Sequence, residues 1–176
     1  MRNACAEIVC AVAALMLASM QAFSTPYQFV NLSTQNSGLS FDTVNKINQD
    51  SRGFIWIGTA KGVNRYDGTS FKVYDREDLG LSSDYIFCSE EDRKGNIWVG
   101  TGKGLSWYDA RSESFRNFTT DDRAVTGIAD TGDGRLMVAA GGDLLFFDKA
   151  EMRFEEGNVL QYSGNIKATE LLGDQE

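Results

Sequence analysis

Short apolar segments alternate with glycine-containing turns through the middle of the chain. The first four segments are Val44–Asn48, Phe54–Thr59, Val63–Tyr66 and Phe71–Tyr74, and they are rich in β-branched and aromatic residues. Residues of these types, bounded by Asp and Gly, favour strands joined by tight turns. The pattern therefore predicts four consecutive short strands here, and no long helix.

The same pattern returns after 42 residues. Leu39–Asp67 aligns with Leu81–Asp109 without a gap, and 13 of the 29 aligned positions are identical. The second copy predicts strands at Tyr85–Glu90, Asn96–Thr101, Leu105–Tyr108 and Phe115–Phe118. Four strands in about 42 residues is the size of one β-propeller blade. We therefore predict an all-β fold of four-stranded antiparallel sheets arranged as propeller blades.

More divergent copies extend the repeat in both directions. A third copy, shifted by 39 residues, has Met137 where the second has Trp98, and predicts strands at 125–129, 134–140 and 144–148. A fourth copy begins near Ile166, and Tyr27–Asp42 aligns with the end of a blade. We therefore expect a partial propeller with an N-terminal outer strand, blades at residues 39–78, 81–119 and 124–157, and a truncated fourth blade at 166–176.

The N-terminus has the pattern of a secretory signal peptide. Arg2 precedes an apolar run of 11 residues, Ile8–Ala18, and Ala22–Ser24 offers a small-x-small cleavage site. Such a run is too short to span about 30 Å of hydrocarbon. We predict a signal peptide at residues 1–24, a propeller segment at 25–176 and a periplasmic location. The alternative is an amphipathic or buried first helix.

Charge and composition exclude several function classes. A formal net charge of -8 argues against nucleic acid, which binds basic surfaces, and favours a neutral or cationic ligand. The chain has no histidine, which removes imidazole-dependent hydrolase, phosphoacceptor and metal chemistry. We therefore expect a non-enzymatic segment without metal or cofactor. Cys88, the only thiol outside the leader, is predicted to be a buried apolar side chain.

Asp50–Asp67 and Asp92–Asp109 share the motif Asp-x-x-Gly-x-Ile-Trp-[Ile/Val]-Gly-Thr-x-x-Gly-[Val/Leu]-x-x-Tyr-Asp, with Leu-Ser-x-Asp upstream of each. This motif resembles the two-component regulator propeller repeat. That repeat occurs in the periplasmic sensor region of hybrid two-component systems, which combine a sensor histidine kinase and a response regulator in one chain, in glycan-degrading bacteria. The resemblance covers Tyr27–Glu176.

The resemblance implies a sensor function. Its ligand would be an oligosaccharide from glycan breakdown, and it would control a downstream kinase and phosphorelay that these residues do not contain. The implied partners are the oligosaccharide and the remaining blades of the sensor, and homodimerisation of the full-length protein stays open. The full-length protein would be anchored in the inner membrane, but this segment is expected to make no contact with the membrane.

Repeated residues are assigned to the scaffold. Trp56 and Trp98 recur once per blade among apolar neighbours, so we predict that they pack between blades rather than stack on a sugar. Asp50 and Asp92 flank glycine turns and are expected to accept hydrogen bonds from nearby backbone amides. The segment Asp130–Gly134 has some similarity to a calcium loop, but its spacing differs and it aligns with a repeat turn.

Residues that do not repeat are the better candidates for ligand contacts, because a ligand touches each blade differently. The loop before the first strand of a blade and the loop between its second and third strands open on one face, since strands alternate in direction. On that face Asp42 with Asp84, and Lys61 with Lys103, repeat and are assigned to the scaffold. The unshared members, which offer stacking rings and hydrogen-bonding groups, are the predicted ligand-binding residues Asn36, Phe41, Ser83, Tyr85, Asp121 and Arg123. Ordinary loop variation is the alternative.

The sequence leaves two functions of different class open. The first is a sensor segment that detects a glycan fragment, and the second is a propeller that acts as a protein-interaction scaffold without binding a small ligand. A propeller lyase or hydrolase is disfavoured, because histidine is absent and no carboxylate pair stands outside the repeated turns.

Overall fold

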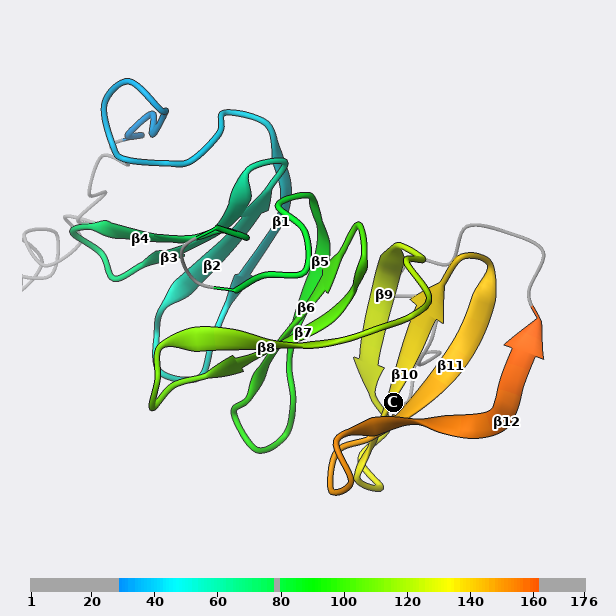
Figure 1. Cartoon of the computed structure of the whole chain (residues 1–176). Coiled ribbons are helices and arrows are strands. Elements are labelled where there is room, and N and C mark those ends of the chain that lie inside the picture. The colour runs from blue at the N-terminus through cyan, green and yellow to red at the C-terminus, as the bar shows by residue number, and fades with distance from the viewer. Residues whose placement is uncertain (1–28, 78–79, 162–176) are drawn as a thin grey trace, which may run out of the picture. The chain divides into compact units, whose positions relative to one another are not determined.

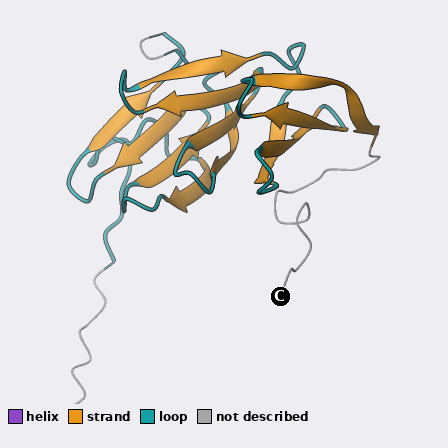
Figure 2. Cartoon of the chain, turned by 90° about the horizontal axis from the view of Figure 1, so that it is seen from below, coloured by secondary structure: helices purple, strands orange, loops and turns teal. Residues whose placement is uncertain are grey.

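The computed structural model describes residues 29–77 and 80–161. The chain divides into two units, Met1–Asn31 and Leu32–Glu176, and the strands found in the described residues belong to the second unit. The described part of that unit consists of strands and loops without a helix (Figure 2). The predicted signal peptide at 1–24 and the predicted fourth blade at 166–176 lie outside the described residues.

Within residues 29–77 and 80–161, twelve strands form three four-stranded antiparallel sheets, each in chain order. The first blade contains β1 (Val44–Gln49), β2 (Ile55–Thr59), β3 (Gly62–Tyr66) and β4 (Phe71–Tyr74). The second contains β5 (Ile86–Glu91), β6 (Ile97–Thr101), β7 (Gly104–Asp109) and β8 (Ser114–Phe118). The third contains β9 (Val125–Asp130), β10 (Arg135–Ala140), β11 (Asp143–Asp148) and β12 (Arg153–Gln161). The predicted all-β blade architecture is confirmed.

The first strand of each blade is the innermost. In Figure 1, β5 lies between β1 and β9, while β4, β8 and β12 form the far edges of their sheets. The inner strands share an irregularity, because the pairing register shifts between Val44 and Lys46 in β1 and between Ile86 and Cys88 in β5. Each blade therefore presents the same strand to its neighbours, as expected for a propeller.

The contact between the first two blades is aromatic. Trp56 of β2 and Tyr74 of β4 are fully buried, and they pack with Tyr108 and Ile86 of the second blade in one apolar cluster. The Trp56 ring meets the Tyr108 ring edge to face, with centroids 5.0 Å apart. Edge-to-face contacts of this kind add to the apolar burial. The prediction that Trp56 packs between blades is confirmed.

The contact between the second and third blades repeats this arrangement. Trp98 is buried and meets Phe147 of β11 edge to face, with ring centroids 5.3 Å apart. Cys88, Val125 and Leu136 belong to the same cluster. Met137, which takes the tryptophan position in the third blade, is only half buried. Apolar bulk is retained at that position without the full burial of an indole.

Glycine is required where the inner strand of one blade approaches β6 or β2 of another. A Cβ on Gly100 would stand 2.6 Å from the carbonyl oxygen of Val125 and would also overlap the Cys88 sulfur. A Cβ on Gly58 would stand 2.6 Å from a methyl group of Ile86. These two glycines come from the repeated Trp-x-Gly-Thr, so that part of the motif sets the distance between blades.

One part of the predicted fold is wrong. The N-terminal outer strand predicted from Tyr27–Asp42 is not formed over residues 29–43, where the structure has loops and a turn at 34–37. An outer strand needs the third strand of its own blade as a hydrogen-bonding partner. The described residues contain no such strand, and Ser33 instead closes the turn by accepting the backbone N–H groups of Asn36 and Ser37.

Candidate functional site

The loops that precede the inner strands and the turns between second and third strands lie on one face, which we call the entry face. Two backbone hydrogen bonds fix this arrangement. Gly62, the first residue of β3 after the β2–β3 turn, donates to the carbonyl of Asp84 at 2.7 Å, and Gly102, in the β6–β7 turn, donates to the carbonyl of Tyr85 at 2.9 Å. The prediction that these two sets of loops share a face is confirmed.

The repeated residues of the entry face hold its loops. Asp42 accepts a 2.7 Å hydrogen bond from the backbone of Thr34, and Asp84 accepts a 2.8 Å hydrogen bond from the backbone of Arg76. In each case the carboxylate lies eight residues after the amide that it binds. Asp42 and Asp84 therefore have the structural role predicted for them.

The predicted residues of the first entry loop differ in accessibility. Asn36 is exposed, and its carbonyl oxygen accepts hydrogen bonds from the backbone and the hydroxyl of Ser33. Phe41 is half buried, with the Lys61 ammonium 5.2 Å from its ring centroid. Asn36 thus supports its own turn, while Phe41 and Lys61 form a cation–π pair at the surface.

The second entry loop carries an exposed aromatic pair. The Tyr85 side chain is 44% exposed and that of Phe87, in β5, is 38% exposed, with their ring centroids 4.7 Å apart. The hydroxyl of Ser83 accepts a 3.3 Å hydrogen bond from the backbone of Tyr85. Phe87 was not predicted as a ligand contact. The sequence signal was available, since the 42-residue shift aligns Phe87 with Asn45 and the aromatic ring does not repeat.

In the third entry loop the two predicted residues face different surroundings. Asp121 is exposed and has a positive φ of 56°. Arg123 is half buried, donates to the carbonyl of Thr120 at 2.8 Å and forms an ion pair of 2.7 Å with Asp143. Arg123 therefore links its loop to the start of β11, whereas Asp121 presents its carboxylate to solvent.

A cavity of about 560 Å³ opens on the entry face at the boundary of the first two blades. We call it the entry-face cavity, and its lining is formed by Ser40, Lys61, Val73, Asp75, Glu77 and Asp84. The lining contains three carboxylates and one ammonium group, so the cavity is acidic. None of the six predicted ligand-binding residues lines it, but Asp84 is adjacent in sequence to Tyr85. Asp84 of the acidic cavity and Tyr85 of the aromatic pair are therefore consecutive residues of one loop.

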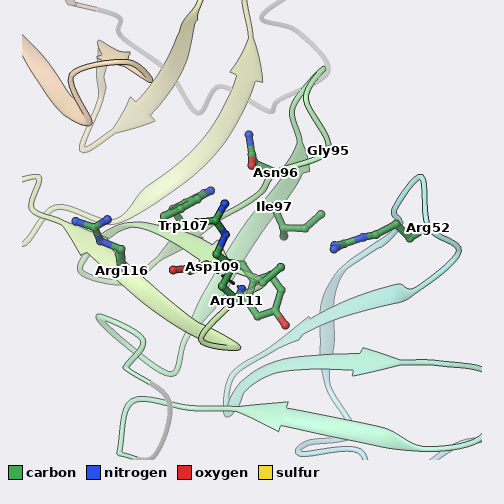
Figure 3. A pocket seen from close by; sticks show the side chains of 10 residues that line it. Arg52, Gly95, Asn96, Ile97, Trp107, Asp109, Arg111 and Arg116 are labelled. Carbon is green, nitrogen blue, oxygen red and sulfur yellow. Dashed lines mark hydrogen bonds between the residues drawn. The ribbon is translucent and has the colours of Figure 1, made fainter.

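A second cavity, of about 490 Å³, lies at the opposite end of the sheets (Figure 3). We call it the arginine cavity. Arg52 enters it from the β1–β2 turn of the first blade, and its other main polar and aromatic residues come from the second blade: Asn96, Trp107, Asp109, Arg111 and Arg116. Sequence reasoning missed this cavity, although the 42-residue shift aligns Trp107 with Arg65 and Arg111 with Thr69, so neither repeats.

The buried carboxylates belong to the scaffold. Asp50 and Asp92 each accept hydrogen bonds from two backbone amides and from the indole N–H of Trp56 and Trp98 respectively. Burial alone raises the pKa of each carboxyl, but these hydrogen bonds outweigh it and hold both pKa values below the ordinary range. The prediction that the two carboxylates bind nearby amides is confirmed, with the indole contact as an addition.

Asp130 joins the second and third blades. It accepts a 2.8 Å hydrogen bond from the backbone of Arg93 and a 2.9 Å hydrogen bond from the Lys149 ammonium. Asp133, in the same segment, pairs with Arg135.

Over residues 29–77 and 80–161 no group of three or more His, Cys, Asp or Glu side chains is placed to hold a metal ion. The described part also contains no helix with the length and apolar character needed to cross a membrane.

Comparison with known proteins identifies the repeat. Residues 38–61 and 80–103 match the family model for the two component regulator propeller. A segment of 56 residues, 32% of the chain, is 39% identical to Histidine kinase P4 of Formosa agariphila and covers 4% of that protein.

Solved structures share the fold. A crystal structure of the extracellular domain assigned to a hybrid two component system of B. thetaiotaomicron matches with a TM-score of 0.67 and 24% identity, over 78% of this chain and 19% of that one. A second such domain from the same organism matches with a TM-score of 0.58 and 19% identity, over 82% of this chain and 19% of that one. The chain therefore carries two-component regulator propeller repeats and has the blade fold of these extracellular domains.

Proposed function

We propose that this chain forms part of the periplasmic sensor propeller of a hybrid two-component regulator. In this proposal the sensor detects an oligosaccharide released by glycan breakdown and controls a histidine kinase that lies outside the described residues. The repeat match and the fold shared with extracellular domains support the sensor assignment. The observation that carries the ligand assignment is the exposed Tyr85–Phe87 pair, which directly follows Asp84 of the acidic entry-face cavity along the chain.

An aromatic pair beside carboxylates suits a neutral sugar. The rings of Tyr85 and Phe87 offer apolar surface to the C–H face of a pyranose. Glu77, which lines the entry-face cavity and is not among the residues assigned to the scaffold, can accept hydrogen bonds from sugar hydroxyls. The predicted residues Asn36, Phe41, Ser83, Asp121 and Arg123 stay proposals as further contacts around this centre.

The same proposal accounts for apolar surface on the first blade. Val44 and Ile47 of β1 are 39% and 60% exposed. The residues that correspond to Val44 in the next two blades, Ile86 and Val125, are completely buried against a neighbouring blade. A further blade packed on β1 would bury Val44 and Ile47 in the same way. We therefore propose that the remaining blades of the sensor are the protein partner of this surface.

The test is calorimetry of the complete sensor region that contains this chain. A panel of neutral oligosaccharides from several polysaccharides is titrated into the parent protein and into the Tyr85→Ala variant. We expect one member of the panel to bind the parent and to bind the variant at least about tenfold more weakly, because a stacking ring is lost. Binding by no member of the panel would contradict the proposal.

The alternative is a protein-interaction scaffold, and the same material tests it. A pull-down with the complete sensor region as bait would identify a stable protein partner of another chain. Such a partner, recovered equally by parent and Tyr85→Ala protein and combined with no response in the oligosaccharide titrations, would assign the propeller to the scaffold class.

A further inference from the structure

The arginine cavity is a basic site in an acidic chain. Three guanidinium groups, those of Arg52, Arg111 and Arg116, line it together with one carboxylate, that of Asp109. The whole sequence, in contrast, has a formal net charge of -8. In Figure 3 the Arg52 side chain extends from the first blade toward the residues of the second, so the two blades supply the positive charge jointly.

Among the residues that the structure describes, two of the three arginines have no acidic partner. Arg52 pairs with the buried carboxylate of Asp50 at 3.0 Å. Within the described part of the chain neither Arg111 nor Arg116 forms an ion pair, and both are exposed. Asp109 accepts a hydrogen bond from the backbone of Arg111, not from its side chain. The cavity therefore contains charge that is not neutralised by the protein.

Trp107 adds a hydrogen-bond donor without an acceptor. Its indole Nε1 is buried and has no partner among the described residues. The Arg116 guanidinium lies 5.9 Å from the ring centroid, opposite it in the β7–β8 pairing. Trp56 and Trp98, by comparison, both donate to an aspartate. A buried donor without an acceptor is unfavourable, but this N–H is covered by the protein, so the accessible donors of the cavity are those of the exposed arginines Arg111 and Arg116.

We propose that the arginine cavity binds an oxyanion group, a carboxylate or a sulfate. Guanidinium groups bind such groups through paired hydrogen bonds, and the donors of Arg111 and Arg116 are available for this. The Trp107 ring supplies the aromatic surface over which the Arg116 guanidinium lies. This site is independent of the proposed sugar contacts at Tyr85 and Phe87, because it lies at the opposite end of the sheets.

The test measures binding of three probes to the complete sensor region that contains this chain: sodium sulfate, glucuronate and, as the uncharged comparison, glucose. Tryptophan fluorescence and calorimetry report binding. We expect sulfate or glucuronate to bind and glucose not to bind. Tighter binding of glucuronate than of sulfate would assign the site to an acidic sugar, and equal binding would assign it to a free oxyanion.

Matched variants locate the binding. The double variant Arg111→Gln/Arg116→Gln removes two charges from the cavity. We expect this double variant to weaken binding of the anion at least about tenfold, the order of magnitude of a lost hydrogen bond to a charged group. Lys103→Gln removes an exposed charge at the opposite end of the sheets and should leave the affinity unchanged. Circular dichroism establishes that each variant is folded.

The outcomes are decisive for this site alone. Equal affinity in the parent and in the Arg111→Gln/Arg116→Gln variant, or equal binding of glucose and glucuronate, would overturn the proposal. Tyr85→Ala should leave anion binding intact, and the arginine variants should leave binding of a neutral oligosaccharide intact. Failure of the sugar proposal and failure of the oxyanion proposal are therefore distinguishable.

Discussion

The indole nitrogen of Trp56 donates a 2.9 Å hydrogen bond to the buried carboxylate of Asp50. The same relationship recurs between Trp98 and Asp92 at 3.1 Å. The other oxygen of each carboxylate accepts the backbone amides of the turn that precedes the second strand. A single carboxylate thus fixes both the turn and the orientation of the ring that packs against the next blade.

Replacement of Asp50 by Asn should destabilise the first blade. The Asn side chain has only one oxygen that can accept a hydrogen bond, because its NH₂ group is a donor. Either the Trp56 indole or the turn amides therefore lose their hydrogen-bond acceptor inside the protein. We expect the local opening free energy of β1 and β2 to fall by about 2–3 kcal/mol. Hydrogen exchange of peptides from these strands, followed by mass spectrometry, measures the change.

The control is Asp122→Asn, which makes the same change of charge in an exposed loop. It should alter the opening free energy by less than about 0.5 kcal/mol. If Asp50→Asn protects β1 and β2 as well as the parent does, the carboxylate is not the organising group of the turn.

The stability of the protein should depend on acid pH through the same carboxylates. The pKa values of Asp50 and Asp92 are held below the ordinary value of 3.8, because hydrogen bonds to the charged form outweigh burial. A depressed pKa stabilises the folded state fully above the unfolded value, and this stability is lost as the pH falls through the folded pKa. The midpoint of thermal unfolding should therefore fall steeply below about pH 4.

The pH dependence can be assigned by comparison with Asp50→Asn. This variant has one fewer carboxylate with a depressed pKa, so its midpoint should fall less steeply with acid than that of the parent. Tryptophan fluorescence as a function of temperature, at several pH values, measures both curves. If the two curves of unfolding midpoint against pH were parallel, Asp50 would not contribute to the loss of stability in acid.

Substitution of Gly100 by Ala should separate the second and third blades. The added methyl group would lie 2.6 Å from the carbonyl oxygen of Val125, a backbone atom that cannot move aside without shifting β9. We expect the free energy of unfolding to fall by about 2–3 kcal/mol. Gly102→Ala is the matched control, since its Cβ would meet the Ser83 hydroxyl at 3.1 Å and no backbone atom. Urea denaturation compares the two variants, and an equal effect would contradict this reading of the blade contact.

Cys88 should be chemically inert in the folded protein. It is buried between the second and third blades, and burial raises the pKa of its thiol to about 12. The thiolate that reacts with iodoacetamide is therefore scarce at neutral pH. Peptide mass spectrometry should find Cys88 unmodified under native conditions and fully alkylated in urea. Rapid native modification would indicate that the blades separate readily.

The sequence predicted the strands because the repeat supplies two independent copies of each. Val44 and Ile86 mark the start of an inner strand in both copies, and most observed strand bounds lie within about one or two residues of those predicted, the usual disagreement at element ends. The prediction failed at residues 29–43. These residues resemble the fourth strand of a blade, but the resemblance does not show whether a third strand is present to pair with them.

Ligand contacts were harder to predict, because they depend on which side chains remain uncovered. Comparison of the repeat copies indicated Tyr85 but not Phe87. Non-repeating residues were considered only in loops, whereas Phe87 belongs to an inner strand. Trp107 and Arg111 were not indicated either, because they lie at the opposite end of the sheets from these loops. Whether Trp107 Nε1 finds an acceptor is a property of the packed blade that spacing along the chain does not reveal.

The most direct test of the central proposal uses Phe87, which only the structure indicates as a ligand contact. Phe87→Ala removes half of the exposed aromatic pair, and Phe87→Tyr keeps the ring. Calorimetry of the complete sensor region with the oligosaccharide selected from the panel measures both. We predict a loss of affinity of about tenfold for Phe87→Ala and near-parental affinity for Phe87→Tyr. Equal affinity of Phe87→Ala and the parent would contradict a sugar site on the entry face.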